Sequence, residues 1–185
     1  MVVSTVGEVP LLAIDASLLC HPAQADRLDV LSDILAPFRC VTTRVVHEEV
    51  GRRVSAAAAE RVATAAWLEE ARVDGLDDFE LMIGWAARLG SGQHHRGEAT
   101  VATVGERENC TVGCDDREAR AIMRNFGLTV HGTLGFIADA IVRQSQHPNA
   151  FAGFIDALVA TGARLPCSGS DFPAWARTNG LLPPA

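Results

Sequence analysis

Lysine is absent from the sequence, and all sixteen basic residues are arginines. A Walker-type phosphate loop and a Schiff-base enzyme each depend on a lysine, as do the aspartyl-phosphate phosphatases and the response-regulator receivers. These four classes of protein are therefore excluded. The formal net charge of −7 argues against a generally basic nucleic-acid-binding surface, so a polyanionic substrate would require local arginines or bound cations.

Paired metal-ligand and disulfide motifs are also missing. The five cysteines form no CxxC pair and no zinc-finger spacing: they are Cys20, Cys40, Cys110, Cys114 and Cys167. We therefore expect reduced, mostly buried thiols. No HExxH motif or paired Cys/His spacing occurs either, which disfavours a zinc site.

Leader and membrane-spanning segments are not evident. The N-terminus has no basic region, and Asp15 interrupts the apolar run Leu11 to Ile14. Neither a secretory signal nor a membrane span fits this pattern, so we expect a cytoplasmic protein with no membrane partner. The chain has 185 residues and no obvious repeat, which predicts a single domain over 1–185, with a core at about 11–145 and a C-terminal helical extension at about 148–180.

The stretch 109–135 combines a strand, an acidic pair and a helix. Cys110 to Cys114 is a short apolar run compatible with a strand, and Asp115 and Asp116 end it. Four apolar residues then share one helical face: Ala119, Ile122, Met123 and Phe126. Leu128 to Val130 is the next predicted strand. Strand, helix and strand in this order indicate a parallel βαβ unit, whose ligand sites lie at the carboxyl ends of strands.

Alternating patterns elsewhere complete the prediction of an α/β fold with a mostly parallel sheet. Strands are predicted at 11–15 and 38–42. Helices are predicted at 24–35, from Thr43 onward, at 55–71, 79–89, from Arg96 onward, and at 133–142, 150–162 and 174–179. The segment 91–95 is predicted to be a loop.

Carboxylates occur at positions where they should meet. Asp15 ends the first strand, and Asp115 or Asp116 ends a later strand of the same sheet. Glu49 shares a helix face with buried valines, and Glu98 begins a stripe of small, core-facing residues. Burying an unpaired carboxylate costs several kcal/mol, so each buried acid should have a partner.

Several carboxylates in one pocket repel one another, and a bound divalent cation reverses that balance. Ligation by oxygen alone suits Mg²⁺ or Mn²⁺, whose chemistry with such ligands is activation of water and stabilisation of a phosphoryl transition state. Taken singly, each acid has an ordinary interpretation as a helix cap or a solvated side chain. Only their joint order favours a metal site.

The order of the motifs resembles that of the PIN-domain nucleases, and in particular a PIN-like subgroup near the VapC-type toxins. The likeness extends in pieces from about Leu11 to about Gly180. The motifs that carry it are Asp15-Ala16-Ser17, His47-Glu48-Glu49-Val50, Gly97-Glu98-Ala99, Cys114-Asp115-Asp116-Arg117-Glu118-Ala119-Arg120 and Val130-His131-Gly132-Thr133-Leu134-Gly135.

The resemblance implies a three-layer α/β/α fold and an endoribonuclease that uses Mg²⁺ or Mn²⁺. It further implies RNA as substrate and, as possible partners, a protein antitoxin and a second copy of the chain. The implied catalytic quartet is Asp15, Glu49, Glu98 and Asp116, with Asp15, Glu98 and Asp116 as metal ligands and Ser17 and Asp115 in support.

The fourth acid requires a choice between two neighbours. The family pattern Thr-x-Asp places Cys114 at the threonine and Asp116 at the ligand. Asp115 and Glu118 fit an Asp-x-x-Glu capping box, so we predict that Asp115 caps the helix and Asp116 binds metal. Because Cys114 lacks the hydroxyl of threonine, an alternative function is a non-catalytic PIN-like module that binds RNA or a protein.

Arginines lie on the helices that would surround the acids: Arg44, Arg52, Arg53, Arg96, Arg117, Arg120 and Arg124. Intrahelical pairing, such as Asp116 with Arg120, explains several of them without RNA. We predict that Arg44, Arg96 and Arg117 contact the nucleic acid. A third alternative, a small-molecule-binding α/β domain, would instead have a deep apolar pocket at the strand ends.

Overall fold

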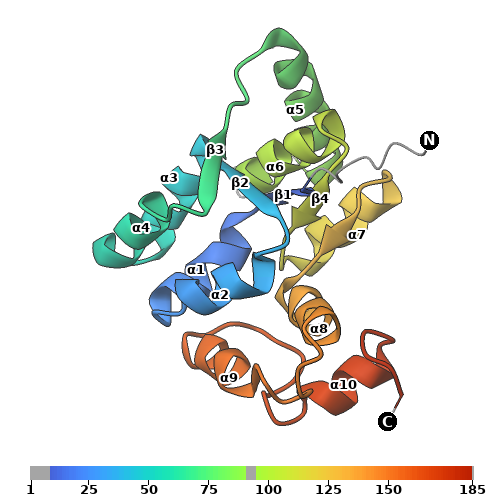
Figure 1. The fold of residues 1–185 in the computed structure, drawn as a ribbon. Coiled ribbons are helices and arrows are strands. Elements are labelled where there is room, and N and C mark those ends of the chain that lie inside the picture. Colours follow the sequence, from blue (N-terminus) through green and yellow to red (C-terminus); the bar gives the residue numbers. More distant parts are fainter. Residues whose placement is uncertain (1–8, 91–94, 185) are drawn as a thin grey trace, which may run out of the picture.

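The structure is a computed structural model that describes residues 9–90 and 95–184, and these residues form an α/β fold (Figure 1). The strands are β1 (Leu11–Ile14), β2 (Arg39–Thr43), β3 (Leu68–Ala71), β4 (Thr111–Gly113) and β5 (Val130–His131). The helices are α1 (Ala16–Gln24), α2 (Leu28–Leu35), α3 (Arg44–Arg53), α4 (Ala56–Ala63), α5 (Leu76–Leu89), α6 (Arg96–Arg107), α7 (Arg117–Asn125), α8 (Thr133–Arg143), α9 (Ala152–Ala160) and α10 (Phe172–Thr178).

The strands form one sheet in the order β3-β2-β1-β4-β5, and every neighbouring pair is parallel. This confirms the predicted parallel sheet. The chain adds β2 and β3 on one side of β1, and then returns to add β4 and β5 on the other. The order therefore reverses between β1 and β4, and ligands of such sheets bind at the carboxyl ends of the strands beside this reversal.

Helices cover both faces of the sheet. A Cβ atom added to Gly113 of β4 would lie 2.9 Å from Leu18 of α1 and 3.4 Å from Phe136 of α8. The preceding residue, Val112, points to the opposite face, where its Cγ2 would be 2.5 Å from a Cβ on Gly105 of α6. Helices α1 and α8 thus lie on one face and α6 on the other, which gives the predicted three-layer α/β/α arrangement.

The central strand β1 is the most deeply buried strand. Leu12, Ala13 and Ile14 are completely inaccessible to solvent, as expected for a parallel strand covered on both faces. The five cysteines are free thiols, as predicted. Among the described residues, the helices are too short or too polar to span a bilayer.

The predicted long helix at 55–71 is wrong in its second half. Helix α4 ends at Ala63, and 68–71 forms the edge strand β3. Its sequence, Leu-Glu-Glu-Ala, has high helix propensity, but the free edge of β2 pairs with it from Cys40–Leu68 to Thr43–Ala71. Tertiary pairing overrides local propensity here.

Smaller differences concern the ends of helices. The helix predicted at 24–35 begins later, because the chain turns after α1 with Asp26 at a φ of 56° and restarts as α2 at Leu28. Pro22 lies inside α1 and does not end it. Of the predicted loop at 91–95, only His95 belongs to the described residues.

Contact between α6 and β4 requires a glycine at position 105. We expect Gly105→Ala to lower the free energy of unfolding by about 1–3 kcal/mol, since the new Cβ would overlap the stiff side chain of Val112. Gly84→Ala is the matched control, because Gly84 lies inside α5 with no atom within 4 Å of its added Cβ and should gain up to about 1 kcal/mol. Urea unfolding of both variants measures the difference; equal stabilities would contradict the described contact.

Candidate active site

Asp15 directly follows β1 and caps the N-terminus of α1. Its Oδ2 accepts hydrogen bonds from the backbone N–H of Ser17 at 2.9 Å and from the Ser17 hydroxyl at 2.6 Å. Its other oxygen, Oδ1, is buried and has no hydrogen-bond partner among the described residues. Capping thus fixes the carboxylate and leaves one oxygen for another ligand.

Two glutamates reach the same place from the neighbouring helices. Glu49 of α3 is buried, as its helical position predicted, and Oε1 forms an ion pair with Arg53 one turn later. Glu98, in the first turn of α6, is also buried. Its Oε1 lies 3.8 Å from Nδ1 of His95, whereas Oε2 has no hydrogen-bond partner within the described part of the chain.

The three acids form a carboxylate cluster, which we define as Asp15, Glu49 and Glu98. One oxygen from each lies within 4.8 Å of the other two. Gly97 makes this approach possible, because a Cβ there would collide with Glu49 Oε2 and lie 3.2 Å from Asp15 Oδ1. The glycine of the Gly-Glu-Ala motif therefore provides space at the centre of the cluster.

Burial makes this cluster unfavourable when all three acids are ionised. Desolvation raises the pKa of each carboxyl, and the charge of Asp15 raises the pKa of Glu49 and Glu98 further. The pKa of Glu98 rises to about 8. Hydrogen bonds among the described residues satisfy only part of the cluster, since neither Asp15 Oδ1 nor Glu98 Oε2 has a hydrogen-bond partner there. A divalent cation bound by hard oxygen ligands fits these two atoms.

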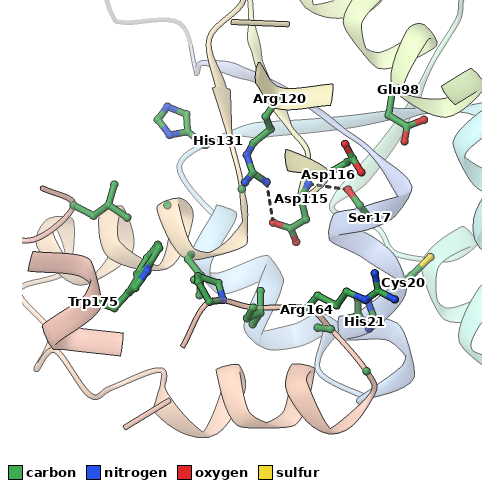
Figure 2. A pocket seen from close by; sticks show the side chains of 18 of the residues that line it. Ser17, Cys20, His21, Glu98, Asp115, Asp116, Arg120, His131, Arg164 and Trp175 are labelled. Atoms are coloured by element: carbon green, nitrogen blue, oxygen red, sulfur yellow. Dashed lines mark hydrogen bonds and ion pairs between the residues drawn. The ribbon is translucent and has the colours of Figure 1, made fainter. Parts of the chain in front are cut away.

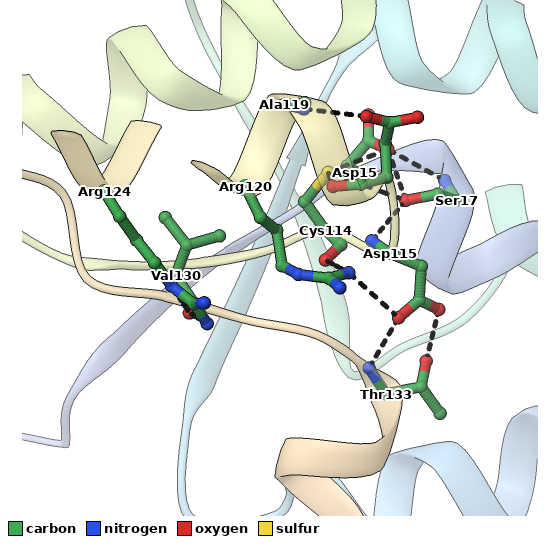
Figure 3. Close-up of polar contacts among 10 residues, drawn as sticks. Asp15, Ser17, Cys114, Asp115, Ala119, Arg120, Arg124, Val130 and Thr133 are labelled. Carbon is green, nitrogen blue, oxygen red and sulfur yellow. Dashed lines mark hydrogen bonds and ion pairs between the residues drawn. The ribbon is translucent and has the colours of Figure 1, made fainter. Parts of the chain in front are cut away.

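The prediction that Asp115 caps the following helix is wrong. Asp116 is the N-cap residue of α7, and its Oδ1 accepts a hydrogen bond from the backbone N–H of Ala119 at 2.7 Å. Asp115 instead reaches α8, where it accepts hydrogen bonds from the backbone N–H of Thr133 at 2.7 Å and its hydroxyl at 2.6 Å (Figure 3). The cap therefore lies one residue later than predicted, and it is not a capping box, because the N3 residue is Ala119.

Asp116 stands apart from the buried cluster but faces the same cavity. It is exposed, and it lines the cavity together with Glu98, Ser17 and Asp115 (Figure 2). Its Oδ2 makes no hydrogen bond to another described residue. The structure therefore brings three of the four predicted acids together, and Asp116 shares only the cavity with Glu98.

Ser17 and Cys114 connect the two strand ends (Figure 3). The Ser17 hydroxyl donates to Asp15 and accepts a hydrogen bond from the backbone N–H of Asp115 at 2.8 Å. The Cys114 thiol is buried, and its Sγ lies 3.9 Å from Asp15 Oδ2. Burial raises the pKa of this thiol well above its usual range, so it remains a neutral, weak donor beside the carboxylate.

A cavity of about 760 Å³ opens onto this site. Four arginines line it: Arg53, Arg120, Arg124 and Arg164. The three arginines predicted to contact nucleic acid, Arg44, Arg96 and Arg117, are exposed and are not among the lining residues. Arg44 forms an ion pair with Glu48 at 3.2 Å. The clustering of acids also disfavours the small-molecule alternative, which required an apolar pocket in their place.

Sequence reasoning missed the cavity residues that follow α9. Arg164 and Trp175 line the cavity, although they lie 66 and 77 residues after Glu98 in the sequence. Their spacing from the acids follows no local pattern. This segment reaches the site because α9 packs against α1. Oγ1 of Thr161, the residue after α9, lies 2.9 Å from Nδ1 of His21 in α1.

Comparison with known proteins agrees with the fold. The sequence model of one family, described as PIN domain, matches residues 11–168, a stretch that includes Asp15, Glu49, Glu98 and Asp116. No curated protein matches the chain.

The raised pKa of Glu98 gives a testable pH dependence. Its ordinary value is 4.5 and its folded value is about 8, so the folded protein binds an extra proton between these pH values. Without metal, the free energy of unfolding should therefore fall as pH rises from about 4.5 to about 8. Glu98→Gln, which imitates the protonated side chain, should flatten this fall.

Urea unfolding in the presence of EDTA measures this effect. Glu118→Gln, at an exposed position in the first turn of α7, is the control and should keep the fall of the parent protein. An identical fall in Glu98→Gln and the parent would show that Glu98 does not titrate in this interval.

Proposed function

The chain belongs to the PIN-domain family, and we propose that it is an endoribonuclease that uses Mg²⁺ or Mn²⁺ to hydrolyse phosphodiester bonds in RNA. One observation carries this proposal. Asp15 Oδ1 and Glu98 Oε2 are buried, lack hydrogen-bond partners among the described residues, and belong to a cluster at the edge where the sheet order reverses. A buried pair of unpaired carboxylate oxygens costs several kcal/mol unless a cation neutralises it.

In the proposed site, Asp15 and Glu98 would hold the cation. Asp116, whose Oδ2 makes no hydrogen bond to another described residue, would add a further oxygen ligand. A divalent cation there would polarise a phosphoryl oxygen and stabilise charge that develops on the leaving group. Ser17 keeps Asp15 in one rotamer through two hydrogen bonds. Asp115 supports the site indirectly, because it ties the end of β4 to the start of α8.

Glu49 has a different proposed role. Arg53 binds one of its oxygens, and the other faces Gly97 at the centre of the cluster. Burial and the charge of Asp15 raise its pKa, which suits a group that accepts a proton from an attacking water molecule. Glu49 would therefore act as general base beside the metal ligands.

A second candidate function is a PIN-domain module that binds RNA or a protein without cutting. Two observations favour it. Cys114 has a thiol where the family pattern has the hydroxyl of threonine, and Asp116 lies outside the buried cluster. The choice of RNA over DNA, a toxin role held in check by an antitoxin, and a homodimer are predictions that rest on the resemblance alone. Cleavage assays separate the two candidates.

Cleavage of labelled single-stranded RNA should require Mg²⁺ or Mn²⁺ and the acidic cluster. We expect Asp15→Asn and Glu98→Gln to reduce the rate by about 100-fold or more, since each removes a charge that holds the cation. Asp33→Asn, at an exposed position on α2, is the matched control and should keep the parent rate. Parent-like cleavage by a folded Asp15→Asn protein would refute the assigned site. A parent protein that binds RNA but cleaves none with either metal would support the second candidate.

Metal binding itself has a readout independent of activity. A cation that binds only the folded state raises the thermal unfolding temperature, by about 2–4 °C for each kcal/mol of stabilisation in a chain of this size. We expect Mg²⁺ to produce such a rise in the parent but not in Gly97→Ala, whose new methyl group would occupy the centre of the cluster. Gly51→Ala is the control, because no atom lies within 4 Å of its added Cβ. A full Mg²⁺ effect in Gly97→Ala would place the cation elsewhere.

A further inference from the structure

The cavity extends well beyond the acidic cluster, to residues for which the proposed chemistry has no use. One wall comes from α1 and from the connection between β5 and α8, where Gly132 lies. The opposite wall comes from the segment 162–166 after α9 and from Trp175 of α10. Figure 2 shows Asp115 and Arg120 near the centre of the view, Arg164 beside His21, and Trp175 on the side away from Glu98.

Two arginines of α7 that line the cavity are fixed by the main chain. Arg120 donates from Nη1 to the carbonyl oxygen of Cys114 at 3.0 Å, and Arg124 donates from Nε to that of Val130 at 3.0 Å. An arginine has five N–H donors, so each retains donors for a further acceptor. Fixed guanidinium groups with unused donors are suited to bind phosphate.

Arg164 provides positive charge on the second wall. It is exposed, and within the described residues it makes no hydrogen bond and no ion pair. Most other arginines near the site already have protein partners: Arg53 pairs with Glu49, for example, and Arg120 approaches Asp115 to 3.9 Å. In a chain of net charge −7, an unpaired guanidinium beside a cavity is available to a phosphate.

Trp175 adds a flat apolar surface to the same wall. It is half-buried, and the ring of Phe172 supports it with a centroid distance of 6.2 Å and an interplanar angle of 31°. The indole N–H makes no hydrogen bond to another described residue. Nucleic-acid bases stack on such supported aromatic rings, and this contact requires a base that is not paired.

We propose that the segment 162–166 and α10 form a binding wall for single-stranded RNA, in which Arg164 binds a phosphate and Trp175 stacks an unpaired base beside the cleavage site. This inference rests on the proposed function and adds a substrate form to it. The cavity volume of about 760 Å³ lies in the range of small-ligand sites and is large enough for an unpaired nucleotide. Stacking on Trp175 requires a free base face, which a duplex does not offer.

Binding of fluorescein-labelled oligouridine, followed by fluorescence anisotropy, tests Arg164. The Asp15→Asn background keeps the RNA intact. Arg164→Gln should weaken binding and reduce the slope of log affinity against log salt concentration by about 0.7, the value for one lost contact to single-stranded phosphate. Arg164→Lys should restore most of the slope. Arg39→Gln is the control, because Arg39 pairs with Glu69 at the opposite end of the strands and should change neither quantity.

Tryptophan fluorescence with unlabelled oligouridine tests Trp175. Stacking should quench the emission of the background protein, and Trp175→Phe should lose this quenching while it keeps affinity within about threefold. Trp175→Leu should bind about tenfold more weakly. Phe126→Leu, at an exposed aromatic residue outside the cavity, should retain both quenching and affinity. An RNA duplex of the same length should bind at least about tenfold more weakly and cause no quenching.

The outcomes separate the inference from the proposed function. If Arg164→Gln and Trp175→Leu are folded and bind oligouridine as the background does, the binding wall is refuted, whereas metal-dependent cleavage by the parent would still support the nuclease. If oligouridine quenches Trp175 but the parent cleaves no RNA, the wall is supported and the nuclease is not. Equal affinity for duplex and single strand would also overturn the inference.

Discussion

Burial of three carboxylates at one edge of the sheet is the constraint on which the site depends. Asp15, Glu49 and Glu98 are each almost inaccessible to solvent, although an ionised carboxylate loses most of its hydration energy when it is buried. The two glutamates are held there because α3 and α6 pack against each other and against β2, and α6 also packs against β1. The pKa of Glu98 rises to about 8 as a result, and the folded protein without metal retains a proton there.

The surrounding structure compensates for this burial selectively. Ser17 satisfies one oxygen of Asp15, Arg53 satisfies one oxygen of Glu49, and Gly97 leaves the middle of the cluster open. The two oxygens without a hydrogen-bond partner among the described residues, Asp15 Oδ1 and Glu98 Oε2, both belong to this cluster. The cavity beside the acidic cluster is lined by arginines, so its wall is positively charged. An acidic centre beside a basic wall is suited to a cation and a phosphate together.

Much of the fold followed from local pattern. The apolar run of β1, the stripe on α7 and the acids that end β1 and β4 were all visible in the sequence, and the parallel sheet followed from their order. Strand β3 was not visible, because its residues favour a helix and only the free edge of β2 selects an extended conformation. The role of Asp115 was not visible either. Its sequence fits a helix cap, but its carboxylate accepts hydrogen bonds from Thr133, eighteen residues later.

The sequence by itself determined where the acids lie: the buried placement of Glu49 and Glu98 follows from helical periodicity, and the positions of Asp15 and of the pair Asp115 and Asp116 follow from strand ends. Helical and strand periods are properties of a few consecutive residues, so they can be read without a structure. The tertiary structure alone decided how these acids divide into a buried trio and an exposed fourth member. It also decided that Arg164 and Trp175 line the same cavity as Glu98 and Asp116, because α9 packs against α1, and no local period encodes that packing.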